Sequence, residues 1–272
     1  MHEKLLENED KLVFGLSGGV DSTTLVHVFG QLKKMYPKLE IFAVTYDDFQ
    51  SKNDPIITFV KNVAAENGIP HYIVSELKVR KRFNLRKSIK KILSELMNTE
   101  DAHKVMYLDH HFTRVSLEIM AREKNVQKIC LGVHATDLLA GILNSFTTGF
   151  PAGIIPKREI SDFTYVYPLC YTTKKEMKYY LHAKDVPHFS SNKVKSWEMN
   201  PLDRNYYYYL ADIIQDYWPG CFQYFFHGSN ILNKEKKTYR ECSNCCSFFI
   251  STDNSKRCDV CDILAKHNYI LT

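Results

Sequence analysis

Residues 12–24 of the chain, LVFGLSGGVDSTT, decide its fold. The run begins as a short apolar strand and turns on two glycines, and residues 21–36 continue with apolar side chains at helical spacing. In such a strand–loop–helix unit, backbone N–H groups and hydroxyls converge at the start of the helix, where the helix dipole adds positive potential. The sequence therefore predicts an anion-binding loop within an α/β sheet.

Strands and helices alternate along the rest of the chain. We expect strands at residues 11–16, 41–46, 71–77, 128–132 and 165–169. We expect further helices at residues 57–68, 84–106, 112–125, 136–147, 173–184 and 203–217. Residues 148–163 are expected to form a loop, and 228–240 a polar linker. The alternation predicts a parallel-sheet, Rossmann-like α/β domain with helices on both faces.

Composition limits the function classes. The 272 residues are 44% apolar with a net charge of +5, which predicts a globular protein with a sizeable core. No stretch approaches the roughly 18 consecutive apolar residues of a membrane span, so we expect a cytoplasmic protein with no membrane partner. Residues 78–91 hold eight Lys or Arg and no acid, a patch that could meet phosphates or simply form a solvated helix face.

The glycine string, Ser17 to Ser22, is not the G-x-x-x-x-G-K-[ST] loop, because no lysine follows the glycines. It resembles the SGGxDS loop of the N-type ATP pyrophosphatases, the PP-loop superfamily, which split ATP into AMP and pyrophosphate to activate a substrate. The resemblance implies that the phosphates contact Ser17, Gly18, Gly19, Asp21 and Ser22. It also implies that Asp21 and Ser22 serve catalysis, with Asp21 suited to holding Mg²⁺.

The second expected strand and its end, AVTYDD at residues 43–48, lie where related enzymes seat the nucleoside. The resemblance implies that backbone groups of Val44 and Tyr46 bind adenine and that Asp47 binds ribose or metal. Asp47 and Asp48 could instead form a helix cap or a turn.

Residues 131–149, LGVHATDLLAGILNSFTTG, are similar to the A-x-G-H-x-x-D-D segment of the tRNA-modifying members. The positions that match are Gly132, Asp137, Leu143, Asn144 and Gly149. The resemblance gives Gly132 a nucleotide contact and Asp137 a catalytic role toward ATP or Mg²⁺, although Asp137 could also be a helix N-cap. His134 stands next to the family's usual histidine position. The likeness continues through residues 167–187 and covers about residues 10–220.

The cysteine-rich tail carries a second motif. Two C-x-x-C pairs, Cys242 with Cys245 and Cys258 with Cys261, have the spacing of a four-cysteine zinc ribbon with a closed, structural Zn²⁺ site. Cys246 could replace Cys245, and the same ligands could hold an iron–sulfur cluster. We expect an ATP pyrophosphatase domain at 1–200, a helical extension and linker at 201–237, and the ribbon at 238–265.

The cysteines that thiolating members use to carry sulfur are missing here. Residues 107–114 and 187–191 contain none. Asp109, His110 and His111 occupy the first of these places, where a histidine could act as a base or the segment could be a polar helix start capped by Asp109. Charged side chains that could steer a polyanionic substrate are Arg114, Lys157 and Arg158.

These observations predict an enzyme that uses ATP and Mg²⁺ to adenylate a nucleobase carbonyl, with tRNA as the expected substrate, before sulfur or nitrogen replaces the oxygen. The same chemistry on a small molecule, such as a deazapurine carboxylate, is the alternative. A zinc-ribbon RNA-binding protein without turnover is a third class. The nucleophile stays open, and so do a sulfur-carrier partner protein and a homodimer.

Overall fold

The computed structural model describes residues 5–47, 55–148, 157–160, 162–189, 204–232, 239–250 and 255–271, so Asp48 and Gly149 lie outside the described residues. A six-stranded sheet forms the centre, in the order β3-β2-β1-β4-β6-β5. Its strands are β1 (Lys11–Gly15), β2 (Glu40–Asp47), β3 (His71–Ser75), β4 (Lys128–Cys130), β5 (Lys157–Ile160) and β6 (Phe163–Val166). Five are parallel, which confirms the predicted α/β sheet.

The sixth strand, β5, corrects one expectation. It pairs antiparallel with β6 at the edge of the sheet, inside the segment expected to be a loop. An edge strand makes ladder bonds on one side only, so its sequence, KREI, needs no continuous apolar run.

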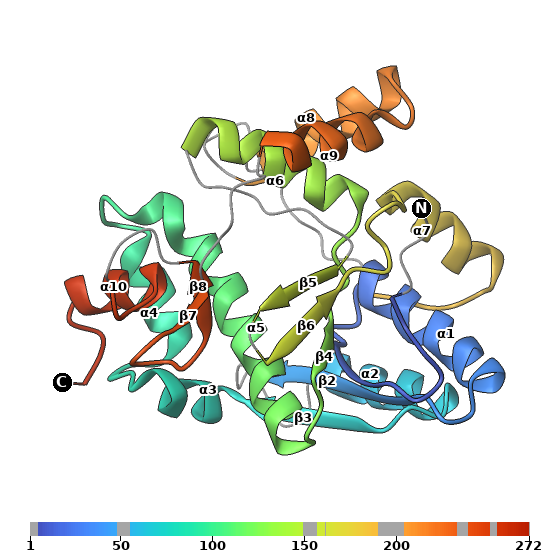
Figure 1. The fold of residues 1–272 in the computed structure, drawn as a ribbon, viewed down its shortest axis with the longest axis horizontal. Coiled ribbons are helices and arrows are strands. Elements are labelled where there is room, and N and C mark those ends of the chain that lie inside the picture. The colour runs from blue at the N-terminus through green and yellow to red at the C-terminus, as the bar shows by residue number, and fades with distance from the viewer. Residues whose placement is uncertain are drawn as a thin grey trace.

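Helices cover both faces of the sheet (Figure 1). In chain order they are α1 (Val20–Met35), α2 (Pro55–Glu66), α3 (Glu76–Phe83), α4 (Ile89–Leu96), the 3₁₀ turn η1 (Ala102–Lys104), α5 (Val105–Glu123), α6 (Ala135–Thr148), α7 (Lys174–Ala183), α8 (Arg204–Tyr217), α9 (Cys221–Leu232) and α10 (Asp259–Lys266). Alternate side chains of β1 enter two cores: Val13 packs with α3, α4 and α5, and Phe14 packs with α1, α2 and α7. Among the described residues, no helix combines the length and apolarity of a membrane span.

The predicted basic helix at 84–106 is wrong. The chain turns at Asn84, which has a left-handed φ of 54° and ends α3. Leu85 then forms a β-bridge with Ile270, and the N–H of Arg86 donates to the carbonyl of Tyr269 at 2.9 Å. The basic run is therefore divided between two short helices that hold the C-terminal segment. Helix α5 begins at 105, earlier than the predicted 112.

The cysteine-rich tail forms a small hairpin, β7 (Tyr239–Glu241) and β8 (Phe248–Ile250), followed by α10. Figure 1 shows this unit beside α4 and α5. Its apolar side chains belong to the same hydrophobic cluster as Phe83, Leu108 and Phe112 of α3 and α5. The ribbon therefore completes one hydrophobic core of the α/β domain.

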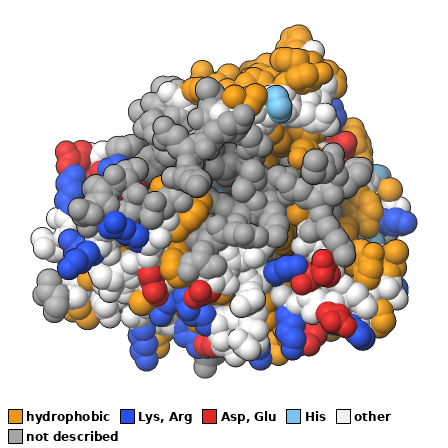
Figure 2. Space-filling model, in the orientation of Figure 1, with side chains coloured by type: hydrophobic (Ala, Val, Ile, Leu, Met, Phe, Trp, Pro, Cys, Tyr) orange, Lys and Arg blue, Asp and Glu red, His pale blue; other side chains and the backbone are white. Residues whose placement is uncertain are grey.

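Helices α8 and α9 pack on α6 at the top of the molecule in Figure 1. Helix α9 was not predicted, and its last residues, 228–232, fall in the segment expected to be a linker. Tyr207, Ala211 and Cys221 are buried against Leu139 and Ala140 of α6. The outer side of the pair carries aromatic side chains that stay exposed, part of the hydrophobic surface over α8 and α9 in Figure 2.

Candidate functional site

The glycine loop joins β1 to α1 in a conformation that requires glycine. Gly18 has a φ of +80°, and a Cβ there would lie 3.3 Å from Phe59 and Val60 side-chain atoms. Its carbonyl accepts a hydrogen bond from the N–H of Phe189 at 2.9 Å, so the segment after α7 closes over the loop. The loop is thus held on both sides by packing and by a backbone bond.

Hydroxyl groups fix the inside of the loop. Ser22 Oγ accepts the N–H of Ser17 at 3.1 Å, lies 3.2 Å from Ser17 Oγ, and donates to the carbonyl of Gly19 at 3.3 Å. Gly19 is the N-cap of α1, and no side chain caps the helix. The uncapped first-turn N–H groups of a 16-residue helix are the donors that bind phosphate oxygens in many nucleotide sites.

Asp21 stands where the loop meets the fourth strand. A Cβ on Gly132 would lie 3.7 Å from the Cβ of Asp21, so the residues after β4 are in van der Waals contact with the loop. Asp21 Oδ2 lies 3.9 Å from Nζ of Lys174, and Oδ1 lies 3.6 Å from Nε2 of His134. Asp21 Oδ1 is buried and accepts no hydrogen bond from the described residues. A buried, unpaired carboxylate oxygen is suited to a cation or a ligand donor.

His134 and Asp137 bind each other at the start of α6. The N–H of His134 donates to Asp137 Oδ2 at 3.1 Å, and the N–H of Asp137 donates to His134 Nδ1 at 3.3 Å. Because Nδ1 accepts, the neutral ring carries its proton on Nε2, which lies 3.4 Å from Asp137 Oδ2. His134 is fully buried. Burial lowers its pKa, opposed by the charges of Asp137 and Asp21.

Two further side chains complete this constellation. Lys174 is the first residue of α7, after the capping box formed by Thr173 and Glu176. Tyr208 of α8 donates its hydroxyl hydrogen to Asp137 Oδ1. Sequence reasoning missed both, because a lysine after a cap and one tyrosine in a run of four carry no local sign of function.

The residues expected to bind the nucleoside lie along the second half of β2. Val44 is buried in the middle of the sheet, and its carbonyl accepts the N–H of Leu16 at 2.8 Å. Tyr46 and Asp47 end the strand at its carboxyl end, the edge at which open α/β sheets bind ligands. The structure places Asp47 at the predicted edge, and all three roles stay predictions.

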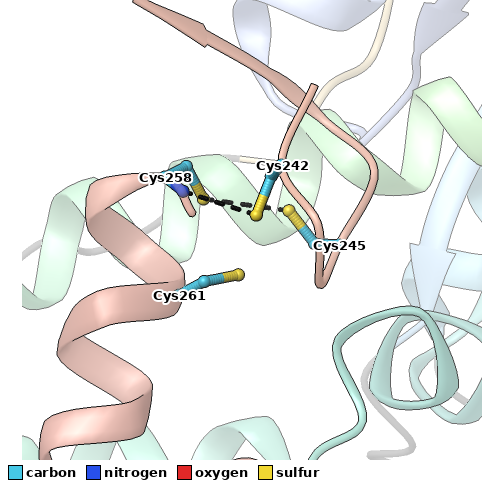
Figure 3. A group of neighbouring side chains, drawn as sticks. All are labelled: Cys242, Cys245, Cys258 and Cys261. Carbon is cyan, nitrogen blue, oxygen red and sulfur yellow. Dashed lines mark hydrogen bonds between the residues drawn. The ribbon is translucent and has the colours of Figure 1, made fainter. Parts of the chain in front are cut away.

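The four predicted ribbon cysteines converge (Figure 3). Cys242 and Cys245 come from the β7–β8 hairpin, Cys258 and Cys261 from the start of α10, and their sulfurs all lie within 4.8 Å of one another. Cys246, with a φ of +52°, is not in this group, so the structure brings Cys245 rather than Cys246 to the other three cysteines. The N–H of Cys258 donates to the sulfur of Cys242 at 3.4 Å, as expected around thiolates.

Three residues do not have the roles that the sequence suggested for them. His111 is buried beside the cysteines, with Nε2 3.9 Å from the sulfur of Cys245 and 4.0 Å from that of Cys258, so it does not reach the glycine loop as a base. Asp109 lies within α5, which begins at 105, and is therefore not its cap. Arg114 donates to Ser247 Oγ at 2.7 Å and holds the ribbon, so it is not a substrate-steering charge. The side chains of Lys157 and Arg158 lie outside the described residues.

The other cysteines do not form a second cluster. All eight cysteines of the chain are described, and the four in the ribbon are the single group of this kind found among the described residues. Cys130, Cys170 and Cys221 are buried, and burial raises the pKa of the Cys130 and Cys221 thiols. A raised pKa disfavours the thiolate that sulfur transfer requires.

Comparisons with known proteins agree with this geometry. The tRNA-cytidine(32) 2-sulfurtransferase of Pseudomonas putida (strain GB-1) is 30% identical over 200 residues, which is 71% of this chain and 67% of that protein. The enzyme of the same name from Neisseria meningitidis serogroup C / serotype 2a is 28% identical over 189 residues, 67% of this chain. The chain spans about half, 54%, of the length of that relative.

A solved structure has the same fold. The U34-tRNA thiolase NcsA from Methanococcus maripaludis, with its [4Fe-4S] cluster, superposes with a TM-score of 0.72 at 16% identity, covering 100% of this chain and 85% of that one. The family model described as the PP-loop domain matches residues 1–206, three quarters of the chain and all of the glycine loop. The chain therefore belongs to the PP-loop domain family.

Proposed function

We propose that this protein is an ATP pyrophosphatase-type enzyme that transfers AMP to a nucleobase carbonyl oxygen of tRNA, after which sulfur or nitrogen displaces AMP. The observation that carries the proposal is the glycine loop, with Gly18 at a positive φ and an uncapped helix behind it. The named activity of the sulfurtransferases that match two thirds or more of the chain supports tRNA as the substrate.

The side chains around the loop suit α-phosphate chemistry. In the proposal, the first-turn N–H groups of α1 and the hydroxyls of Ser17 and Ser22 hold the departing pyrophosphate, where negative charge grows in the transition state. Lys174 adds a positive charge 3.9 Å from Asp21. Mg²⁺ bound by Asp21 would supply charge neutralisation of the phosphates. The unpaired Oδ1 of Asp21 fits this role.

The nucleophile must come from outside the ATP site. A cysteine relay would need thiolates beside the loop, and the buried Cys130, Cys170 and Cys221 do not form a cluster there. The cysteines near the sheet therefore do not fit an iron–sulfur cluster at the glycine loop. Sulfide delivered by a carrier protein, or an amine, remains compatible with the site.

For the ribbon we propose one structural Zn²⁺. Tetrahedral Zn–S bonds of about 2.3 Å place the sulfurs roughly 3.8 Å apart. The sulfurs of Cys245 and Cys258 are 3.8 Å apart, and all four lie within 4.8 Å. A cubane iron–sulfur core between the same thiolates needs more space than this. Metal analysis tests the assignment: one Zn per chain is expected, lost in Cys261→Ser and kept in Cys246→Ser.

Pyrophosphate release tests the activity. We expect release from Mg·ATP only when unmodified tRNA is present, and none after the tRNA is digested with ribonuclease. Asp21→Asn should abolish release, whereas the matched control Asp216→Asn, an exposed acid of α8 that pairs with Lys175, should keep it. Equal release without tRNA would contradict the nucleobase substrate, and an active Asp21→Asn variant would contradict the site.

A further inference from the structure

We propose that Tyr208 is a positioning residue for the nucleotide site, and that through it helices α8 and α9 become part of that site. This inference deepens the proposed function and rests on it. Tyr208 lies beyond residue 206, where the match to the PP-loop domain ends, so the family motifs do not include it. Its hydroxyl donates to Asp137, 71 residues earlier in the chain.

The contact engages Oδ1 of Asp137, while the start of α6 engages Oδ2. Oδ2 accepts the N–H of His134 at 3.1 Å and lies 3.4 Å from the ring nitrogen Nε2. Oδ1 accepts from Tyr208. Because donors lie at both oxygens, they restrict rotation of the carboxylate plane. A hydrogen bond to a charged acceptor is among the stronger ones in proteins.

The carboxylate in turn faces the loop through His134. The ring of His134 lies between Asp137 and Asp21, with Nε2 3.4 Å from one carboxylate oxygen and 3.6 Å from the other. His134 is 0% exposed, and its Nε2 makes no hydrogen bond to another described residue. Tyr208, Asp137, His134 and Asp21 therefore form a continuous row from α8 to the glycine loop.

Packing of α8 on α6 holds the helix that carries Tyr208. Tyr207 and Ala211, on either side of it in α8, are buried against Leu139 and Ala140 of α6. This packing anchors the backbone of α8 that carries Tyr208 beside Asp137. A ligand that shifts α8 would therefore move Tyr208 relative to Asp137, whose carboxylate lies 3.4 Å from His134 Nε2.

The test removes only the hydroxyl. Tyr208→Phe should raise the KM for Mg·ATP and the Mg²⁺ concentration for half-maximal pyrophosphate release about tenfold, the effect of losing a hydrogen bond to a charged group. Its thermal midpoint and zinc content should stay close to those of the wild type. The matched control is Tyr217→Phe on the same helix, whose ring is 89% exposed and which should behave as wild type.

A double mutant separates positioning from packing. If Tyr208 acts through Asp137, the Tyr208→Phe change should add little in an Asp137→Asn background, because the acceptor carboxylate is already gone. Full additivity, or an unchanged Mg²⁺ dependence in Tyr208→Phe, would overturn the inference.

A binding measurement separates the test of Tyr208 from the test of the proposed tRNA-dependent activity. Affinity for a non-hydrolysable ATP analogue, with Mg²⁺ and with chelator, should fall in Tyr208→Phe only when Mg²⁺ is present. This measurement needs no turnover, so it holds even if tRNA proves not to be the substrate.

Discussion

Replacing Arg114 by Met should release the ribbon from the nucleotide-binding domain. Arg114 donates to Ser247 Oγ at 2.7 Å and to the carbonyl of Phe248 at 3.2 Å, and its Nε lies 3.2 Å from Glu118 Oε1. Glu118 is 4% exposed in its side chain and also accepts from Tyr165 at 2.5 Å. Methionine fills a similar volume but leaves this buried carboxylate without its cation.

The expected loss of stability follows from the burial of the ion pair between Arg114 and Glu118. Removing one partner of a buried ion pair costs about 3–5 kcal/mol of unfolding free energy. The Arg114 side chain is 25% exposed, so water can reach the vacated place, and we expect the lower end, about 3 kcal/mol. An unfolding entropy of roughly 2.1 cal/mol/K per residue gives roughly 570 cal/mol/K for 272 residues. The thermal midpoint should then fall by about 5 °C.

Urea and thermal unfolding, with zinc release followed by a chromogenic chelator, measure the effect. Zinc should leave Arg114→Met faster than the wild type, because the hairpin that carries Cys245 loses its anchor. The control is Arg122→Met on the same helix, an exposed arginine whose guanidinium lies 5.0 Å from the ring centre of Phe163. It should lose no more than about 1 kcal/mol. Equal losses in the two variants would refute the anchoring role.

Three further outcomes are expected. Burial lowers the pKa of His71 to about 4, below its unfolded value near 6.5, so the unfolded state binds more protons between these pH values. The free energy of unfolding should therefore fall from pH 6.5 toward 4, by no more than about 2 kcal/mol after allowing for partial exposure. His71→Gln should flatten this part of the pH profile measured by urea unfolding. Gly30→Ala would put a Cβ 2.5 Å from Asn67 Oδ1 and should destabilise by about 1–3 kcal/mol, whereas Gly141→Ala, with nothing within 4 Å, should stabilise by about 0.5–1 kcal/mol in the same denaturation assay. Gly18→Ala should lose ATP-analogue binding in calorimetry, because its φ of +80° costs an alanine about 1–3 kcal/mol; unchanged affinity would contradict the role of the loop conformation.

The parts of the site that could be predicted from the sequence are those with contiguous signals. A strand, two glycines and a helix in one short stretch predict the glycine loop, and paired cysteines predict the ribbon. Tyr208 has no such signal, because its partner Asp137 lies in another helix. The contact exists only once α8 has packed on α6.

Dependence on contacts between distant segments also explains why the helix predicted at residues 84–106 is wrong. Residues 84–106 look helical because lysines and leucines favour helices, and nothing local stops them. The chain turns there because Leu85 and Arg86 pair with the backbone near Ile270 and Tyr269. A contact between segments so far apart in sequence overrides propensity, and its register is set only in the folded protein. The place of His111 could not be predicted for the same reason, because the cysteines near it are distant in the chain.

Sharing one core between the ribbon and helices α3 to α5 has a consequence for biosynthesis. Those helices leave the ribosome more than a hundred residues before Cys242, a delay on the order of ten seconds at ~5–20 residues per second. Throughout that interval Phe83, Leu108 and Phe112 lack the side chains that later cover them. Nascent chains should therefore depend on chaperones at this stage. With the proposed Zn²⁺ in the ribbon, zinc supply would then determine how much of the protein matures, because metal binding and folding of such a unit are coupled.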